Sequence, residues 1–345
     1  NFPLKEVRFL LEAFEYTQNI QTLPGFEAFD LDTTMALVEQ SGKFFSEVFL
    51  PLNALGDSEG CQFHPDDHSV TMPAPFLKAY QQTREQGLIG LVNSPEFGGF
   101  GAPHTIGMLI NEMGPATNDS LWHCAGLTIA LIEALELHGS DEQKATFLPK
   151  LISGEWTGTM CLTEPNAGSD LGLMTTKAIP EEDHYRLTGT KIWITFGEHD
   201  LSENIIHLVL ARLPDAPAGI KGISLFVVPK IDFDGTRNPI FCTGIEHKMG
   251  LNASPTCVMS LEGAKGWLIG EPHKGMRAMF TMMNNARLTV GSGGVGLSES
   301  AYQTALAFAK ERRQGRSLDP TKHDQDASAD GILVHPDVRR MFLNM

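Results

Sequence analysis

Apolar residues recur every three or four positions through residues 1–155, which is the spacing of one helical face. The helices predicted from this pattern cover residues 2–16, 32–50, 76–86, 106–137 and a short segment up to residue 151. Asp30 or Asp32 is the expected N-cap of the second helix, and Pro51 is expected to end it. The long apolar stretch is expected to form two buried helices that separate near residues 117–120.

Between residues 156 and 270 the pattern changes to short apolar or alternating runs, which predict strands. These runs cover residues 185–187, 191–195, 206–212, 223–229 and 256–261. Turn-forming Gly, Pro, Asn and Asp residues separate them, as is typical of a small antiparallel sheet or barrel. The helical period then returns at Gly275, with helices predicted over 276–297, 297–313 and from Pro336 onward.

The sequence therefore predicts an α+β fold. Its expected parts are an N-terminal all-α domain at 1–155, a middle antiparallel β domain or barrel at 156–274, and the start of a C-terminal helical bundle at 275–345. Four glycines lie between residues 291 and 296, and each costs a helix up to about 1 kcal/mol relative to alanine. Their density indicates close helix-to-helix or helix-to-ligand approach. The polar segment 317–330 is expected to be an exposed or disordered loop.

Acidic residues outnumber basic ones, with 42 Asp and Glu against 26 Lys and Arg and a net charge of −16. This balance argues against nucleic acid or an anionic membrane as the main partner. The five cysteines form no C-x-x-C pair, and a pair of histidines at 64 and 68 fits a solvated loop better than a metal site, so no metal is expected. With no apolar run judged long enough to span a membrane, the protein is predicted to be cytoplasmic.

Two short segments have a composition suited to a flat heteroaromatic ligand. The segment Met-Cys-Leu-Thr-Glu-Pro-Asn-Ala-Gly-Ser-Asp at 160–170 is a loop that exposes backbone amides and the hydroxyls of Thr163 and Ser169. In Lys-Ile-Trp-Ile-Thr at 191–195, strand alternation is expected to place Trp193 and Thr195 on one face. An indole beside a hydroxyl, facing free amides, suits a ring with donors and acceptors along its edge, and a flavin is such a ring.

These segments resemble the T-E-P-x-A-G-S-D and K-x-W-I-T motifs of the acyl-CoA dehydrogenase family. The resemblance extends over G-x-x-x-Q-K and L-P-x-L-x-x-G-E at 139–155 and a K-x-G-x-x-x-S-like entry after residue 246. It implies FAD as the cofactor and oxidation of an acyl-CoA thioester to its 2,3-enoyl form. The positions that match the family's flavin contacts are Met160, Leu162, Thr163, Gly168, Ser169, Trp193, Ile194 and Thr195.

The resemblance also implies substrate and partner contacts. Ser169 matches a CoA contact, and Asn284, Asn285 and Arg287 match the segment that borders the pantetheine and adenosine portion. Arg312 matches the arginine of E-R-x-x-F-G, which reaches the flavin pyrophosphate across a subunit interface, although the Phe of that motif is missing here. The implied partners are an acyl-CoA, an electron-transfer flavoprotein as electron acceptor, and further copies in a homodimer or homotetramer.

The general base is not assigned to any residue of this sequence. Most of the family places a glutamate well downstream of E-R-x-x-F-G, so it is expected beyond Met345, and the minority position before Arg287 holds Ala286. The chain is accordingly interpreted as part of a longer polypeptide. In that reading, the glutamate removes the α-proton while the β-carbon passes a hydride to flavin N5.

Within the family, the chain is most similar to the larger bacterial branch that includes 3-methylmercaptopropionyl-CoA dehydrogenase. Methionines at 276, 279, 282 and 283 are compatible with a thioether substrate, although methionines at helical spacing more often belong to the core. Two alternatives stay open: a flavin-binding relative that associates with nucleic acid without dehydrogenating, and a non-catalytic fragment.

Overall fold

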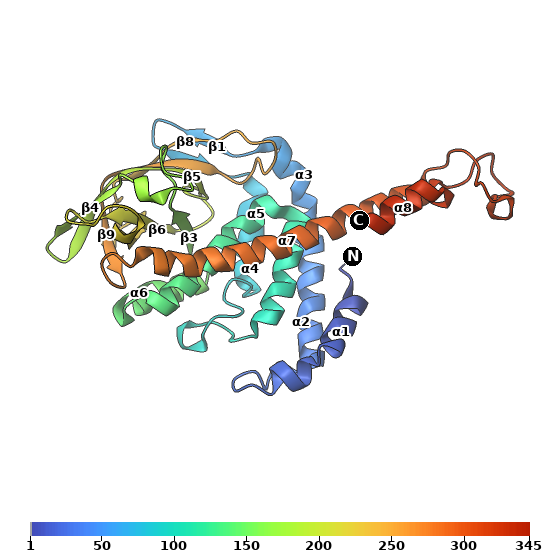
Figure 1. Ribbon diagram of the computed structural model, residues 1–345, viewed down its shortest axis with the longest axis horizontal. Coiled ribbons are helices and arrows are strands. Elements are labelled where there is room, and N and C mark those ends of the chain that lie inside the picture. The colour runs from blue at the N-terminus through green and yellow to red at the C-terminus, as the bar shows by residue number, and fades with distance from the viewer. Residues whose placement is uncertain (1) are drawn as a thin grey trace.

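The computed structural model describes residues 2–345 and combines a helical layer, a β-sheet and, at residues 312–345, a projecting arm (Figure 1). The helices of the first part are α1 (Leu4–Ala13), α2 (Leu31–Phe44), α3 (Leu50–Glu59), α4 (Ala74–Glu85), α5 (His104–His138) and α6 (Asp141–Ile152). Their apolar faces meet around α5, whose buried residues contribute a large share of the first hydrophobic core. The predicted helical first part is thus confirmed.

The prediction that Pro51 ends the second helix is wrong. Asp30 caps α2 through a hydrogen bond of 2.7 Å from the Thr33 amide to Asp30 Oδ1, but helical structure then continues through a π-helical turn, η2 (Phe45–Phe49), into α3. Proline is tolerated in the first turn of a helix, where its missing amide hydrogen has no helical partner to lose. Pro51 stands in that turn of α3.

The long helix α5 is broken by a kink in its first half. Asn118 has non-helical angles (φ −157°, ψ 87°) and Pro115 lies one turn earlier, so two helices meet where the sequence predicted their separation. By length and apolar composition α5 passes the test for a membrane-spanning helix, contrary to the expectation from sequence. However, 61% of its most apolar window is buried inside the protein, as in a core helix.

The middle of the chain forms a seven-stranded sheet, and a separate hairpin lies earlier in the chain, between α3 and α4. The hairpin is β1 (Gln62–His64) with β2 (Ser69–Thr71); the sheet contains β3 (Trp156–Cys161), β4 (Lys177–Glu181), β5 (His184–Thr195), β6 (Asn204–Arg212), β7 (Ile223–Pro229), β8 (Ile240–Ile245) and β9 (Thr256–Ile269). The sheet is mixed rather than antiparallel, because β6 pairs in parallel with β3 and with the start of β4. Residue alternation does not distinguish the two kinds of pairing, so the sequence could not reveal this.

The sheet separates two hydrophobic cores. Along β6, Leu208 and Leu210 belong to the core shared with the helices, while Val209 and Ala211 belong to the core inside the β domain. This alternation is that of a strand covered on both faces. A close contact between Gly158 and Leu131 fixes β3 against α5, since a Cβ at Gly158 would lie 2.8 Å from the leucine side chain.

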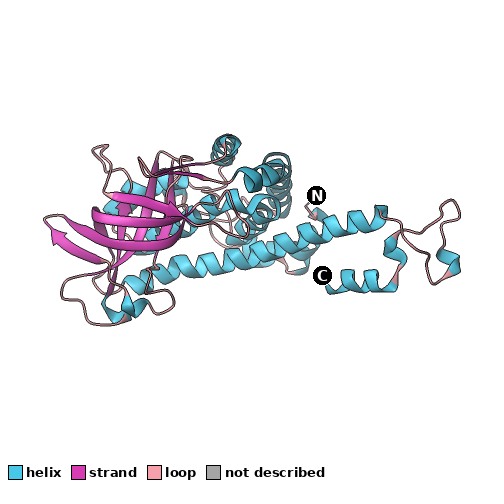
Figure 2. Cartoon of the chain, turned by 90° about the horizontal axis from the view of Figure 1, so that it is seen from above, coloured by secondary structure: helices cyan, strands magenta, loops and turns pink. Residues whose placement is uncertain are grey.

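A single helix, α7 (Gly275–Glu311), leads from the sheet along α5 and out into the arm (Figures 1 and 2). The two helices predicted over this range are therefore one. Its 37 residues make it roughly 55 Å long at 1.5 Å per residue. Close approach to α5 is confirmed at two glycines: a Cβ at Gly296 would lie 2.2 Å from the Glu112 carbonyl oxygen, and one at Gly293 would lie 3.0 Å from Pro115.

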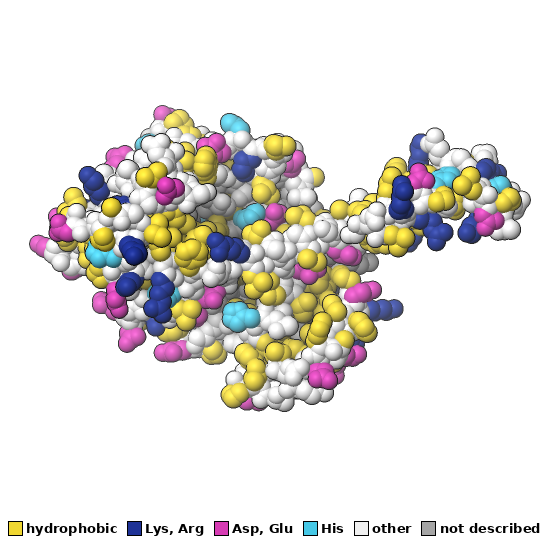
Figure 3. All heavy atoms as spheres, in the orientation of Figure 1, with side chains coloured by type: hydrophobic (Ala, Val, Ile, Leu, Met, Phe, Trp, Pro, Cys, Tyr) yellow, Lys and Arg dark blue, Asp and Glu magenta, His cyan; other side chains and the backbone are white. Residues whose placement is uncertain are grey.

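The arm ends in an ordered loop and a short helix, α8 (Pro336–Asn344). The segment 317–330 is exposed, as predicted, but it is organised around the buried Asp330. The Asp330 carboxylate accepts hydrogen bonds from the amides of Ser317 and Asp324, each at 2.7 Å, and from Arg316 at 3.0 Å. Figure 3 shows Lys and Arg side chains over this part of the surface.

We predict opposite effects of alanine at two glycines of α7. Gly296→Ala should lower the free energy of unfolding by about 1–3 kcal/mol, because its methyl group forces α7 away from the Glu112 backbone. The matched control is Gly294→Ala, which has open space at the Cβ position and should raise it by up to about 1 kcal/mol. Urea denaturation checks both values, and equal effects would contradict the proposed contact.

Candidate functional site

The loop at 163–170 and the strand end at 191–195, separate in sequence, lie side by side. The Ile192 amide donates a 2.9 Å hydrogen bond to the Thr163 carbonyl, which joins the end of β5 to the start of the loop. The loop closes on itself through two reciprocal 3.0 Å bonds between Glu164 and Ala167. Pro165 and Asn166 form the turn between them, as their composition predicts.

A buried ion pair anchors this junction. Lys191 Nζ lies 2.9 Å from Glu164 Oε1, and the two side chains are 0% and 3% exposed. Lys191 also donates a 2.9 Å hydrogen bond to the Leu162 carbonyl. Glu164 in turn accepts hydrogen bonds from the Thr175 amide and hydroxyl, at 2.6 and 2.9 Å, and from the Thr176 amide at 3.1 Å. Both charges are therefore compensated, as charges taken out of water require.

The pKa of Glu164 reflects the balance between burial and these contacts. Burial alone raises the pKa of the carboxyl, but the Lys191 charge and the donors of Thr175 and Thr176 outweigh it and bring the pKa to about 2. Burial lowers the pKa of Lys191, and the carboxylate of Glu164 opposes that shift. The Glu164 carboxyl is therefore ionised at neutral pH, and the Lys191 amino group is its partner in the ion pair.

Trp193 occupies a bulge two residues after the anchored lysine. Lys191 pairs with Met259 and Ile194 with Cys257, so β5 has one residue more than β9 between these pairs. Trp193 has φ = +58°, a left-handed conformation that is unusual for a bulky residue, and its side chain is 57% exposed. The simple alternation predicted for this strand is thus interrupted at the indole. Strain of this kind clusters at functional sites.

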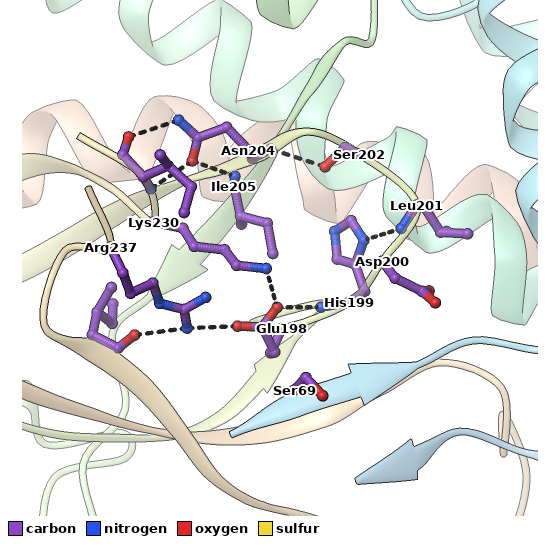
Figure 4. A network of polar contacts seen from close by, with 12 residues as sticks. Ser69, Glu198, His199, Asp200, Leu201, Ser202, Asn204, Ile205, Lys230 and Arg237 are labelled. Carbon is purple, nitrogen blue, oxygen red and sulfur yellow. Dashed lines mark hydrogen bonds and ion pairs between the residues drawn. The ribbon is translucent and has the colours of Figure 1, made fainter. Parts of the chain in front are cut away.

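A second buried carboxylate holds the chain beyond the bulge (Figure 4). Glu198 is 1% exposed and forms ion pairs with Lys230 and with Arg237 Nη2, the latter at 2.8 Å. The neighbouring His199 is buried, and its ring accepts a 3.1 Å hydrogen bond from the Leu201 amide. Charged anchors therefore fix the backbone on both sides of Trp193.

The predicted flavin contacts differ in how far they are exposed. Met160, Leu162, Thr163 and Thr195 are partly exposed, and Gly168, Ser169 and Trp193 are exposed. Ile194 is the exception, because its side chain is buried in the β-domain core and leaves only its backbone available. The structure brings the members from residues 160–169 and 193–195 together where β3 and β5 end, and we call this margin of the β domain the site edge.

The predicted substrate residues on α7 lie in its first half, where the helix packs on α5. Asn285 donates a hydrogen bond to Glu133 of α5, which joins the two helices. Arg287 is exposed, donates a 3.0 Å hydrogen bond to Asn284 Oδ1 and lies over the Phe280 ring at 5.5 Å. The charge of Arg287 therefore stays in contact with water, and no desolvation energy opposes its position. No hydrogen bond or ion pair described within residues 2–345 joins this segment to the loop at 163–170.

Arg312 lies directly after α7, at the start of the arm. Its side chain is exposed and donates a 2.9 Å hydrogen bond to Gln314. Along the helix axis it stands about 37 Å beyond Arg287. A single copy of the chain therefore does not unite Arg312 with the α7 substrate residues.

The sequence did not reveal the charged residues whose ion pairs hold the backbone of the site in place. Lys191 was read only as the first letter of a motif, and Glu198, Lys230 and Arg237 were not singled out. The available signal was a charged residue next to strongly apolar runs, as in Lys-Ile-Trp-Ile and Val-Val-Pro-Lys. Such a residue is costly to bury alone, which predicts a partner but does not say which one.

Comparison with known proteins identifies the family. The pattern of the acyl-CoA dehydrogenase N-terminal domain matches residues 36–155, and that of the middle domain matches residues 159–264. A probable acyl-CoA dehydrogenase of Bacillus subtilis, YngJ, is 32% identical over 77% of this chain and 69% of its own length. The chain belongs to the acyl-CoA dehydrogenase family.

Two further similarities are to a curated relative and to a solved structure. The 3-methylmercaptopropionyl-CoA dehydrogenase of Ruegeria pomeroyi is 44% identical over 99% of this chain, and the chain spans 58% of that relative's length. The fold matches a solved acyl-CoA dehydrogenase complexed with FAD from Bacillus anthracis, with a TM-score of 0.73, 24% identity, and coverage of 91% of this chain and 48% of that one.

We predict that His207 makes the β domain sensitive to acid. Burial, with help from Arg237 and Lys230, lowers its pKa from 6.5 to about 3. The unfolded chain therefore binds a proton that the folded chain does not, so the stability contributed is complete above pH 6.5 and falls as the pH decreases toward 3. Between pH 7.5 and pH 5 the loss amounts to about 2 kcal/mol.

Urea denaturation of wild type and His207→Gln at these two pH values isolates the effect from the other titrating groups. On going from pH 7.5 to pH 5, the free energy of unfolding of the wild type should fall by about 2 kcal/mol more than that of the variant. A difference that does not vary with pH would contradict a neutral, buried His207.

Proposed function

We propose that this chain holds FAD at the site edge formed by residues 160–169 and 193–195 and acts in the α,β-dehydrogenation of an acyl-CoA thioester to its 2,3-enoyl form. The observation that carries the proposal is an exposed, conformationally strained indole fixed beside a loop whose Thr163 hydroxyl has no partner described within residues 2–345. Membership of the acyl-CoA dehydrogenase family supports it. When bound, FAD supplies the hydride acceptor.

The residues present fit such a ring. The Trp193 indole offers a flat apolar surface, and the Thr163 and Thr195 hydroxyls can donate to acceptors at the ring edge. Neither hydroxyl has a hydrogen-bond partner among those described for residues 2–345. The roles proposed for Met160, Leu162, Gly168 and Ser169 are to surround the ring and meet the CoA portion, while Asn284, Asn285 and Arg287 border the substrate.

The larger assembly follows as part of the same proposal. Because Arg312 lies on the arm, away from the site of its own chain, it would serve the flavin pyrophosphate of a second copy in a homodimer or homotetramer. An electron-transfer flavoprotein is the proposed electron acceptor, and the cytoplasm is the proposed compartment. The proposed domains are 1–155, 156–274 and 275–345, and the general base is a glutamate supplied from outside these residues.

The similarity to the Ruegeria pomeroyi relative favours 3-methylmercaptopropionyl-CoA as the substrate. The test is an anaerobic titration of FAD-loaded protein that includes the segment supplying the glutamate, first with that thioester and then with butyryl-CoA and octanoyl-CoA, followed by visible absorption. We expect the first thioester to bleach the flavin most strongly. A yellow protein that stays oxidised with all three would contradict dehydrogenation by this polypeptide and favour a flavin-binding protein without that activity. A protein that does not bind FAD would contradict the flavin site itself.

We predict that Trp193→Gly separates stability from FAD binding. Glycine accepts φ = +58° without the cost of about 1–2 kcal/mol that the left-handed region imposes on other residues. Glycine also loses more entropy on folding, so the free energy of unfolding should change by less than about 1 kcal/mol. FAD affinity should fall about tenfold, because the ring loses its aromatic surface.

Glu182→Gly is the matched control for this experiment. Glu182 is exposed, has φ = +48° and lies in the turn between β4 and β5. Its replacement should change stability in the same way and leave FAD affinity unchanged. Isothermal titration with FAD and urea denaturation give the two values. An unaltered affinity in Trp193→Gly would contradict the proposed role of the indole.

A further inference from the structure

We propose that Lys191 is a positioning residue for the proposed flavin site. Through its contacts with Glu164 and the Leu162 carbonyl, it holds the loop at 163–170 and the Trp193 bulge in the arrangement that receives the flavin ring. The inference rests on the proposed function. Lys191 is fully buried and belongs to no exposed surface, so it would act without touching the cofactor.

The contacts of Lys191 reach both sides of the junction. Its ammonium group binds the carbonyl of Leu162 and the carboxylate of Glu164, which are the residues on either side of Thr163. The Thr163 carbonyl is held by the Ile192 amide, one residue after the lysine. Thr163 is therefore fixed through its own carbonyl and through both neighbours, while its hydroxyl carries none of these bonds.

The same lysine marks the start of the bulge. Regular pairing with β9 runs from Thr188 to Lys191 and resumes at Ile194, and Trp193 lies between these last two pairs. A strained conformation persists only where the surroundings over-determine it. On the Lys191 side the surroundings are the ion pair and the Ile192–Thr163 hydrogen bond. Loss of the ion pair would allow the strand to relax and the indole to leave the site edge.

The carboxylate extends the anchor to a third segment. Glu164 binds Thr175 and Thr176, which lie just before β4. The loop is thus tied at its start to β5 and beyond its end to β4. Replacing only one charge of this pair would leave the other buried without a partner, and that is far more harmful than removing both.

The experiment compares three variants of the pair with wild type. Lys191→Met removes the cation, Glu164→Gln removes the negative charge and keeps the size but replaces one accepting oxygen with a donating amide, and Lys191→Met together with Glu164→Met removes both charges. Lys177→Met is the control, because Lys177 is an exposed lysine of the same sheet. For each protein the measurements are the melting temperature, the dissociation constant for FAD and the quenching of flavin fluorescence at saturating FAD.

The expected pattern separates positioning from general stability. Lys191→Met should lower the melting temperature, and the double variant should recover most of it. Both should bind FAD at least tenfold more weakly and lose quenching, because the Trp193 indole no longer lies against the ring. Glu164→Gln should weaken FAD binding severalfold, and Lys177→Met should match wild type in all three measurements.

FAD affinity within twofold of wild type, together with wild-type quenching, in any folded variant of the pair would overturn the inference. The double variant leaves no buried charge without a partner and so keeps the test possible if the single variants do not fold. Failure of the wild-type protein to bind FAD would instead overturn the proposed function, so the two failures are distinguishable.

Discussion

The candidate site depends on one constraint, which is that the opposite charges of Lys191 and Glu164 are kept out of water and must stay together. An isolated buried ion costs several kcal/mol, so the fold tolerates these two only in mutual contact and with further hydrogen bonds to the backbone. That requirement joins the end of β3, the loop after it, the start of β4 and the end of β5 at one point. The strained indole is a consequence, since an extra residue between two fixed pairs has to bulge outward.

The packing of the sheet on α5, and of α5 on α7, supports this junction although it lies outside the site. The sheet is held against α5 by the close contact at Gly158, and α5 is held against α7 by the glycines that face its kink. A kink at Asn118 and small residues on α7 are complementary, because each allows the two helix backbones to approach where straight helices with ordinary side chains would not. The helical layer therefore acts as a rigid backing for the site edge.

Much of the fold was predictable because periodicity reports local geometry. The helix-to-strand change after residue 155, the break near residue 118 and the return to helix at Gly275 were all readable. Parallel pairing of β3 with β6 was not, since alternation is the same for either direction. Pro51 was misread because its effect depends on whether a new helical turn begins there, which neighbouring residues decide.

Some residues of the candidate site could also be predicted from the sequence, because their types are a local signal. Motif residues such as Thr163 and Trp193 stand out because their types are unusual in a loop or at a strand end. The partner of Lys191 could not be read, because the pairing joins residues 27 positions apart through tertiary structure. The bulge at Trp193 could not be read either, since it exists only in the register between β5 and β9.

The long helix α7 also has a mechanical consequence. A bend of about 6° at its base would displace the far end of a rod roughly 55 Å long by about 6 Å, which is more than one helical turn. Its glycine-containing middle segment is packed on α5 only on one side, since Gly291 and Gly294 face open space. The stiffness of that segment sets how accurately the arm, with Arg312 at its start, can be delivered to a neighbouring molecule.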